Sequence, residues 1–322
     1  MKPEFQAHFL ITGGLGFIGS HLAQFLLDQG GSVTVLDDES TGRVLNIQRF
    51  QNHKRFRWIR GDIRILQDCH KACEGIDYVL HQAAVGSVPR SIAQPDVSTA
   101  VNVQGFVHML MASKEAKVKK FVYASSSAVY GNSDQPVKRE GEEGQPLSPY
   151  AITKQVGEHY AQNFYQLFGL RTIGLRYFNV FGPYQDTQSS YAAVIPRFVT
   201  SLQNQKPGII YGDGLQSRDF TYIDNVIDAN VKACFASSRA DGQAFNVACG
   251  KTYTLRTIYS KILDHLNMNL DPEYTASRAG DVRHSHADIA KAYDFLGYEP
   301  LVDLETGLAQ TVSWYQQNFQ KS

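Results

Sequence analysis

Apolar and polar residues alternate along the first half of the chain with the periods of short strands and amphipathic helices. We expect strands at 9–11, 33–36, 55–60, 77–81, 121–125 and 172–177. We expect helices at 19–29, 101–116 and 150–168, and another that ends at Cys73. Strands separated by helices of this length are typical of a parallel sheet, and wholly apolar runs such as VTVL indicate that both its faces are covered. The pattern predicts an α/β, Rossmann-type doubly wound fold.

Past about residue 177 the pattern changes. Gly, Pro and Tyr become denser, as in FGPYQ and KPGIIYGDG, and the apolar runs become shorter. We therefore predict a Rossmann domain over 1–177 and a smaller, mixed C-terminal substrate domain over 178–322. Segments of the second part, such as 222–236, are expected to return to the first.

The turn between the first expected strand and helix is rich in glycine. It reads LITGGLGFIGS and contains Gly13, Gly16 and Gly19. Glycine lets the chain turn tightly and lets a pyrophosphate approach the helix N-terminus, where unpaired N–H groups and the helix dipole favour anions. Glycine-rich turns are common, but one that ends a strand and opens a helix this early in a βαβ pattern predicts dinucleotide binding.

The end of the second expected strand carries Asp37, 18 residues after Gly19. A carboxylate there accepts hydrogen bonds from both ribose hydroxyls and repels a 2′-phosphate, so NAD is favoured over NADP. Asp38 adds to that repulsion. Arg43 is a nearby cation that could argue otherwise, and we interpret it as a solvated loop charge.

Two further strand ends are expected at the cofactor. Asp62 follows one of them and is placed to meet the adenine, although a plain turn aspartate is the alternative. Ala83 and Ala84 follow another, where small side chains let a cofactor lie close. His81 at that strand end is expected to be a hydrogen-bonded structural histidine and not a catalyst.

Tyr150 and Lys154, in YAITK, lie one helical turn apart on one face. A neighbouring ammonium lowers the pKa of a phenol, so we expect the tyrosine to act as a base near neutral pH. This spacing arises often by chance. Downstream of a dinucleotide turn, and shortly after SSSAVYG, it predicts hydride chemistry.

The whole chain resembles the extended short-chain dehydrogenase/reductase family, through TGGLGFIGS, Asp37, SSSAVYG, YAITK and RYFNVFGP. The resemblance implies that Ser126, four residues before the tyrosine of the Tyr-Gly pair, joins Tyr150 and Lys154 in catalysis, with Ser127 as the neighbour that could be confused with it. Lys154 would also hold the nicotinamide ribose. Further NAD contacts are implied at Phe17, Ile18, Ile63 and Tyr177.

The residues after Ser126 bear on the reaction. In this family the 4,6-dehydratases carry Asp-Glu in the next two positions and the glucuronate decarboxylases carry a Glu there, whereas this chain has Ser127 and Ala128. Neither side chain ionises near neutral pH, which argues against both reactions. A 4-epimerase needs only oxidation and reduction at one carbon, with NAD regenerated in each cycle.

The C-terminal half is most similar to nucleotide-sugar epimerases, in particular to bacterial UDP-N-acetylglucosamine 4-epimerases. The similar stretches include GSVPRS, YAAVIPRF, SRDFTYIDNVI and AGDVRHSHAD. Arginine suits a pyrophosphate because its donors match phosphate oxygens in pairs; Arg218 and Arg278 are the candidates, with surface salt bridges as the alternative. The other implied substrate contacts are Gly86, Ser87, Ser126, Ser127, Asn179, Ala193, Val194, Tyr211, Asp281 and Ser285.

Ser285 bears on the sugar. In bacterial galactose-only epimerases of this family a bulky tyrosine fills the matching position, and a serine leaves room for an N-acetyl group at carbon 2. Drift in a loop is the alternative. In the related epimerases a second serine often lies two positions after the catalytic serine. This chain has Ala128 at that position. The alternatives left open are a UDP-glucuronate, UDP-glucose or UDP-xylose 4-epimerase, with Arg90 or Arg283 as candidate carboxylate partners, and a non-catalytic NAD-binding scaffold.

Composition narrows the partners. The 31 basic and 31 acidic residues balance, which offers no electrostatic footprint for nucleic acid or an anionic membrane. There is no apolar run of membrane-spanning length and no signal-peptide core before Phe9. Cys69 and Cys73 are spaced for a shared metal or disulfide, but few cysteines favour plain thiols. We expect a cytoplasmic protein without a metal site, and the resemblance implies a homodimer through a four-helix bundle built from 101–116 and 150–168.

Overall fold

The computed structural model describes residues 5–186, 193–276 and 283–318. Its centre is a seven-stranded, wholly parallel sheet in the order β11-β6-β5-β4-β1-β2-β3. The strands are β1 (His8–Thr12), β2 (Ser32–Asp37), β3 (Phe56–Arg60), β4 (Tyr78–His81), β5 (Lys120–Ser126), β6 (Thr172–Tyr177) and β11 (Gln243–Val247). The sheet and the smaller mixed sheets after it confirm the predicted fold class.

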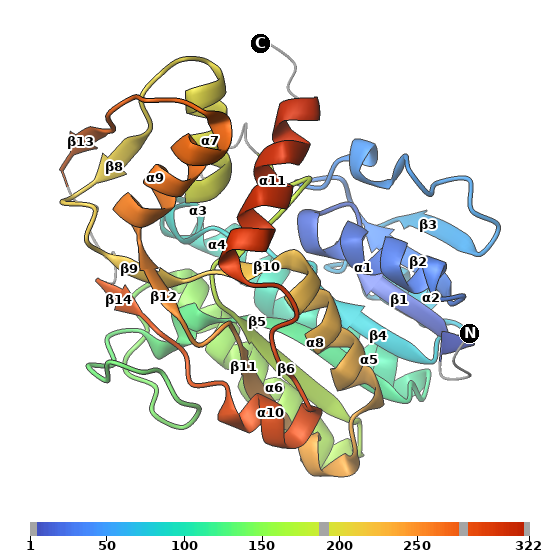
Figure 1. Cartoon of the computed structure of the whole chain (residues 1–322). Coiled ribbons are helices and arrows are strands. Elements are labelled where there is room, and N and C mark those ends of the chain that lie inside the picture. The colour runs from blue at the N-terminus through green and yellow to red at the C-terminus, as the bar shows by residue number, and fades with distance from the viewer. Residues whose placement is uncertain (1–4, 187–192, 277–282, 319–322) are drawn as a thin grey trace.

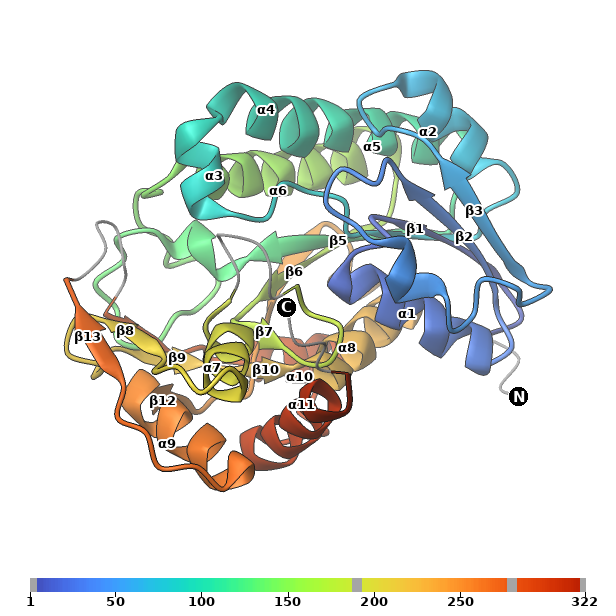
Figure 2. The same cartoon turned by 90° about the horizontal axis from the view of Figure 1, so that it is seen from above.

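Helices cover both faces of this sheet (Figures 1 and 2). One face carries α1 (Phe17–Asp28) and α8 (Ile223–Phe235), which pack on each other. The other face carries α2 (Leu66–Cys73), α5 (Phe106–Glu115) and α6 (Pro149–Phe168). Next to these three lie α3 (Val88–Ala93), α4 (Pro95–Thr99) and the π-helical turn η3 (Ala100–Gly105), which runs directly into α5.

Helix α6, which carries the predicted Tyr150 and Lys154, is delimited by its own sequence. The Ser148 hydroxyl accepts a hydrogen bond from the Ala151 N–H (3.2 Å), and Pro149 occupies the first helical position, where its missing N–H costs nothing. Gly169 ends the helix in the left-handed conformation, with φ of 70°. The first turn, and Tyr150 within it, is thereby fixed at the carboxyl ends of the sheet strands.

The C-terminal part forms a smaller lobe beside those carboxyl ends (Figure 1). Its strands are β7 (Val180–Phe181), β8 (Ile209–Tyr211), β9 (Ser217–Asp219), β10 (Thr221–Tyr222), β12 (Thr252–Thr254), β13 (Glu273–Thr275) and β14 (His284–Ser285). They pair as β10-β7, β12-β9-β14 and β13-β8. Its helices are α7 (Val194–Gln203), α9 (Leu255–Leu266) and α11 (Leu304–Asn318), whereas α10 (Ala290–Leu296) packs on β11 and α8 beside the main sheet. Short 3-10 turns are η2 (Val44–Ile47), η4 (Ser127–Tyr130) and η5 (Ser238–Ala240).

The chain crosses back to the main sheet after its first excursion. Helix α8 spans most of the predicted returning segment 222–236 and packs on β5, β6 and β11. Strand β11, which no sequence pattern had singled out, follows as the edge strand beside β6. The apolar core under α1 and α8 continues without a break into the lobe through Phe198, Ile258 and Leu308. The division at residue 177 therefore stays a prediction, because the two parts share a core.

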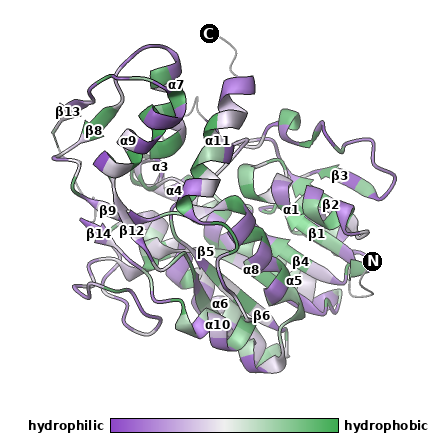
Figure 3. Cartoon of the chain, in the orientation of Figure 1, coloured by the Kyte–Doolittle hydropathy of each residue, from purple (hydrophilic) through white to green (hydrophobic). Residues whose placement is uncertain are grey.

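The central strands are mostly hydrophobic, and the helices over them mix hydrophobic and hydrophilic residues (Figure 3). A second apolar cluster fills the other face, between the sheet and α2, α5 and α6. All four cysteines are free thiols, and burial raises the pKa of Cys69 to about 12 and that of Cys73 to about 11. None of the helices in the described ranges is both long enough and apolar enough to cross a membrane.

Candidate active site

The glycine turn after β1 is packed so closely that side chains are excluded from it. Gly13 has a φ of +68°, and a Cβ added there would lie 2.8 Å from the Ala83 main-chain nitrogen and Cα. The Gly16 N–H donates to the Gly13 carbonyl (3.1 Å), and Gly16 precedes the first residue of α1. No side chain caps the start of α1, where Phe17, Ile18 and Gly19 form the first turn. The N–H groups there are available to an anion such as a pyrophosphate.

A pocket of about 660 Å³, open solvent included, extends from this turn along the ends of β1, β2, β3 and β4. Its lining includes most of the predicted cofactor residues: Gly13, Gly16, Asp37, Asp38, Asp62, Ile63, Ala83 and Ala84. Val85, Val101 and the loop Ser40–Gly42, which the sequence did not indicate, complete the walls. A site that spans four strand ends, with a glycine turn and three carboxylates in its lining, fits a dinucleotide.

Asp37 is buried at the middle of this pocket. Its carboxylate accepts hydrogen bonds from the main-chain N–H groups of Leu15 (3.0 Å) and Glu39 (2.9 Å). Burial raises the pKa of this carboxyl above its ordinary value, against the effect of those two hydrogen bonds. Each oxygen keeps a further lone pair, so the carboxylate is held in place to receive ribose hydroxyls.

The charges around the pocket are more paired than the sequence suggested. Burial tends to raise the pKa of Asp62, but hydrogen bonds from Arg64 outweigh this and hold the pKa below its usual value. Arg43 is exposed, which agrees with its interpretation as a solvated loop charge, and its guanidinium lies 2.6 Å from the Asp186 carboxylate. Sequence spacing gave no sign of that pair, whose members are 143 positions apart.

Ser126, Tyr150 and Lys154 come together at the carboxyl end of β5. Ser126 ends the strand and Tyr150 lies in the first turn of α6, where its hydroxyl shares a hydrogen bond with Ser126. The Lys154 ammonium lies 5.8 Å from the centre of the Tyr150 ring and donates to the Ala124 carbonyl (2.8 Å). A reacting hydroxyl at this cluster would meet two hydroxyls and one ammonium.

The expected lowering of the tyrosine pKa is not what the structure shows. Burial raises the pKa of Tyr150 above its ordinary value, and the Ser126 hydrogen bond opposes this only in part. Burial also lowers the pKa of Lys154 to about 8, against the attraction of Glu158 one turn along the helix. Desolvation penalises the charged form of both groups, and helical spacing alone did not predict it.

Asn102, in the π-helical turn η3, connects the two candidate sites. Its amide oxygen accepts from the Val85 N–H (2.8 Å), and its amide nitrogen donates to the Val85 carbonyl (3.2 Å) and the Thr153 hydroxyl (3.1 Å). It thereby fixes the loop after Ala84 against α6. The sequence analysis did not identify Asn102, because the π-turn that directs its side chain inward has no sequence signature comparable to a helix cap.

His81 is structural, as expected. Its ring is buried between Phe106 and Phe121, and its Nδ1 lies 2.9 Å from the Thr12 hydroxyl. Burial lowers the pKa of His81 to about 3, so it is neutral at physiological pH. Tyr177 is also buried, and its hydroxyl donates to Gln82 (3.1 Å), a residue of the cofactor pocket.

A second pocket lies in the C-terminal lobe, with Val88 and Pro89 of α3 in its wall. Five of the predicted substrate residues line it: Asn179, Ala193, Val194, Tyr211 and Arg218. The prediction missed Val88, Pro89, Arg197, Gln216 and Phe220. Arg197 could have been found, because it follows Val194 by one helical turn on α7. Its guanidinium lies 5.6 Å from the centre of the Tyr211 ring.

Most of the described residues that line this pocket are aromatic or aliphatic, and the charged ones among them are Arg197 and Arg218. Arg218 donates to the carbonyls of Ser217 (2.9 Å) and Arg283 (3.2 Å). Asn179, at a φ of 35°, donates to the Asp219 carbonyl (2.8 Å). Flat apolar walls with arginines at hand suit an aromatic base attached to phosphates.

The remaining predicted substrate positions either line neither of the two pockets or lie outside the described residues. A side chain at Gly86 would meet open space, and Ser87 caps α3 by accepting from the Arg90 N–H (3.2 Å). Ser127 begins η4 directly after Ser126, and Ser285 on β14 pairs with Arg218 on β9. Arg278 and Asp281 lie outside the described residues.

A dinucleotide pocket, connected through Asn102 to the helix that carries a tyrosine and a lysine next to a serine, defines an enzyme of the short-chain dehydrogenase/reductase type, which exchanges hydride with a nicotinamide. The profile of the NAD dependent epimerase/dehydratase family matches residues 9–248, and the chain belongs to that family. It is therefore an NAD-dependent enzyme.

Individual relatives cover nearly the whole chain. A UDP-N-acetylglucosamine 4-epimerase from Methanobrevibacter ruminantium, solved with UDP-N-acetylmuramic acid, is 38% identical over 98% of this chain and 99% of its own, with a TM-score of 0.93. A UDP-glucose 4-epimerase of Mycolicibacterium smegmatis is 35% identical over 97% of this chain and 99% of its own. A UDP-glucuronic acid 4-epimerase from Bacillus cereus, solved with UDP-glucuronic acid and NAD, is 33% identical over 97% of this chain and 100% of its own, with a TM-score of 0.90.

Proposed function

We propose that this enzyme catalyses the reversible 4-epimerisation of a UDP-hexose, with UDP-N-acetylglucosamine and UDP-N-acetylgalactosamine as the preferred pair. The observation that carries the proposal is the Ser126, Tyr150 and Lys154 cluster beside a strand end without an available acid. NAD supplies a reversible hydride acceptor when bound. The 4-hydroxyl would become a ketone and be restored with the opposite configuration.

In this reaction Ser126 hydrogen-bonds the reacting hydroxyl and Tyr150 takes its proton. The Ser126 hydrogen bond favours the phenolate form of Tyr150 against its burial, and we propose that the Lys154 ammonium, 5.8 Å from the ring centre, acts in the same direction when the proton is taken. Lys154 also holds the nicotinamide ribose. The proton returns from Tyr150 to the sugar oxygen when the ketone is reduced.

Elimination of water would need a carboxyl group at the sugar, and the residues after Ser126 do not provide one. Glu158 contacts this strand end through the Ser125 hydroxyl (2.5 Å), but both its oxygens are bound to Arg176 (2.9 and 2.7 Å). A carboxylate engaged in this way is not free to donate or accept the proton of a substrate. The site therefore favours epimerisation over dehydration.

The sugar is the less direct part of the proposal. Ser285 lies next to Arg218 in the β9–β14 pair. Because Arg218 lines the second pocket, which we propose binds the UDP group and call the nucleotide pocket, we place Ser285 at its border. A small side chain there leaves space for an N-acetyl group. The relative from Methanobrevibacter ruminantium, with its N-acetylated ligand, supports this preference.

UDP-glucuronate is the main rival substrate, because relatives with that activity are also similar to this chain. The two cations considered for its carboxylate are otherwise engaged. Arg283 pairs with Asp213 (2.9 Å) at an exposed position, and Arg90 hydrogen-bonds Gln94 (3.4 Å). Neither lines the nucleotide pocket. We therefore favour the N-acetylated substrate.

The test is direct. Purified enzyme is incubated with UDP-N-acetylglucosamine, UDP-glucose, UDP-glucuronate and UDP-xylose in turn, and the products are separated by chromatography. We expect the fastest conversion with UDP-N-acetylglucosamine, and its loss in Tyr150→Phe. Clear conversion of UDP-glucuronate without conversion of UDP-N-acetylglucosamine would refute the proposed substrate. Unchanged turnover in Tyr150→Phe would refute the catalytic assignment.

We also propose a cytoplasmic homodimer that pairs α5 and α6 with their copies. Ile152, Tyr160 and Leu167 are exposed apolar residues along α6. Free thiols are typical of the reducing cytoplasm. Light scattering at micromolar concentration should give twice the mass of one chain, and Tyr160→Glu should shift the protein toward the monomer. A wild-type monomer under these conditions would refute the dimer.

A further inference from the structure

Asn246 on β11 connects three separate segments of the chain, and the reaction scheme above does not use it. Its side chain is fully buried. Its amide oxygen accepts from the Tyr130 hydroxyl (2.7 Å), and its amide nitrogen donates to the carbonyls of Lys138 and Asp288 (2.9 Å each). Its main-chain N–H donates to the Glu140 carboxylate (2.7 Å). Every donor and the acceptor of the side chain are therefore used.

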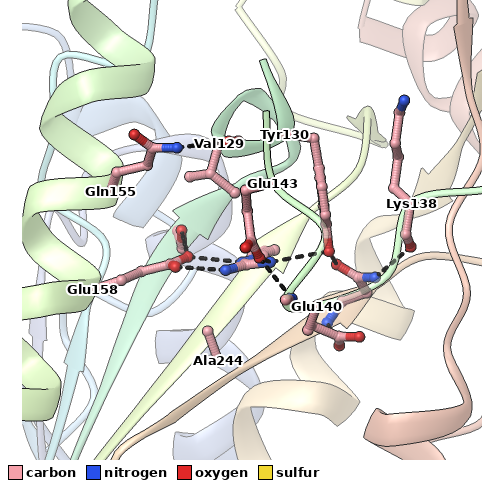
Figure 4. Close-up of polar contacts among 12 residues, drawn as sticks. Val129, Tyr130, Lys138, Glu140, Glu143, Gln155, Glu158 and Ala244 are labelled. Atoms are coloured by element: carbon pink, nitrogen blue, oxygen red, sulfur yellow. Dashed lines mark hydrogen bonds and ion pairs between the residues drawn. The ribbon is translucent and has the colours of Figure 1, made fainter. Parts of the chain in front are cut away.

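The first of these segments is the turn that follows the catalytic serine. Tyr130 ends η4, whose first residue follows Ser126 directly. The Tyr130 hydroxyl also accepts from Arg176 (3.0 Å), which in turn binds Glu143 and Glu158. In Figure 4 the side chains of Tyr130, Glu143 and Glu158 point toward this shared centre. A buried polar network of Tyr130, Arg176, Glu143 and Glu158 thus holds this turn in place.

The second segment carries the proposed substrate residue Ser285. Strand β14 is only two residues long, and Ser285 pairs there with Arg218. The residues that follow β14 are bonded to Lys138. The Lys138 N–H donates to the His286 carbonyl (2.7 Å), and the Lys138 carbonyl accepts from the Asp288 N–H (3.0 Å). We call this contact between Lys138 and residues 286–288 the seam, and Asn246 bonds to Lys138 and Asp288 across it. Asn246 therefore holds the segment that directly follows Ser285.

We propose that Asn246 is a positioning residue that sets the spacing between Ser285 and the turn after Ser126, and so sets the selectivity for the sugar. The inference rests on the proposed function, because it assigns the sugar to the space between these two segments. An amide of this size can donate to two carbonyls and accept from a tyrosine at once. A shorter hydroxyl has one donor, so it cannot bond both carbonyls at once and would let the two segments move apart.

The experiment compares Asn246→Ser with Asn225→Ser. Asn225 is an equally buried asparagine that bonds the main chain of Leu301 and Val302 (2.8–2.9 Å), away from both pockets. We expect the ratio of kcat/KM for UDP-N-acetylglucosamine over UDP-glucose to change about tenfold in Asn246→Ser. The ratio should stay within about twofold of wild type in Asn225→Ser, because a general loss of stability lowers both values together.

Two further measurements make the inference specific. In a Ser285→Tyr background the ratio should no longer respond to Asn246→Ser, because the space that the seam controls is filled. The dissociation constant of UDP alone should remain close to that of wild type. If Asn246→Ser does not fold, Tyr130→Phe removes a single hydroxyl of the same network and should shift the ratio in the same direction.

An unchanged ratio in a folded Asn246 or Tyr130 variant overturns the inference, as does an equal shift in Asn225→Ser. The wild-type assay separates this failure from that of the proposed function. If wild type converts another UDP-sugar and not UDP-N-acetylglucosamine, the proposed substrate fails. The inference is then judged on that sugar, by whether Asn246→Ser weakens the UDP-sugar more than UDP alone.

Discussion

Replacing Lys154 by methionine should abolish turnover and yet stabilise the protein freed of NAD at neutral pH. Methionine matches the length and flexibility of the lysine stem but carries no charge. The structure lowers the pKa of Lys154 from 10.5 to about 8 through burial, so the folded state holds the charged form at a cost. Removal of the charge is therefore expected to raise the free energy of unfolding, whereas removal of a stabilising residue would lower it.

The magnitude follows from that shift. A pKa lowered from 10.5 to about 8 corresponds to about 3 kcal/mol. The lysine keeps some solvent contact, which reduces the realised cost to about 2 kcal/mol. Methionine also loses the hydrogen bond to the Ala124 carbonyl, which contributes about 1 kcal/mol. We expect Lys154→Met to be more stable than wild type by about 1 kcal/mol at pH 7.

The pH dependence provides the internal check. Below pH 8 both the folded and the unfolded chain hold the lysine proton, so the full cost is present in wild type. Between pH 8 and 10.5 the folded chain releases the proton while the unfolded chain keeps it, so wild type gains stability as pH rises. The advantage of Lys154→Met should therefore shrink from pH 7 to pH 9.5 by about 1 kcal/mol.

Urea unfolding of both proteins at these two pH values measures the difference. Lys71→Met, at an exposed position on α2, is the control and should change stability by less than about 0.5 kcal/mol at either pH. A Lys154→Met protein that is less stable than wild type at pH 7, or whose difference from wild type does not depend on pH, would contradict the assigned cost of burying this charge.

Three further predictions concern the cofactor, the nucleotide and the pH range of activity. Gly13→Ala should cost about 1–2 kcal/mol of stability for its left-handed backbone and should abolish co-purification of NAD, because the new methyl group meets Ala83; bound NAD that equals the wild-type amount would disprove this packing. Arg218→Ala should weaken UDP binding by about tenfold or more in calorimetry and leave NAD content unchanged, whereas loss of NAD as well would indicate a general structural role. Turnover should fall as the pH rises above about 8, because Lys154 is needed in its charged form, and a rate that stays constant to pH 10 would argue against that requirement.

The parts of the molecule that sequence predicted well are those fixed by local rules. The six N-terminal strands and four of the helices between or beside them follow from hydrophobic period, although α3 and α4 were not predicted. The glycine turn was predicted from its composition and position, and the close approach of Gly13 to Ala83 gives the physical reason for it. The helix that carries Tyr150 and Lys154 begins after the N-cap residue Ser148 and ends at Gly169. These features depend on residues near one another in the chain.

The features that sequence missed depend on contacts between distant residues. Strand β11 reads QAFNV, and nothing in five residues says that they pair with β6. Arg43 meets Asp186, and Asn246 meets Tyr130, across more than 100 positions. The pKa of Tyr150 depends on how deeply its ring is buried, which helical spacing does not contain. Sequence patterns therefore gave the residue types of the site but not their electrostatics.

The central claim is that hydride leaves and returns to the same sugar carbon without loss of water. UDP-N-acetylglucosamine that carries deuterium at C4, incubated with the enzyme in ordinary water, tests it by mass spectrometry and NMR of the product. The account predicts UDP-N-acetylgalactosamine that retains the deuterium at C4. Loss of the label to solvent, or a product lighter by one water molecule, would contradict it.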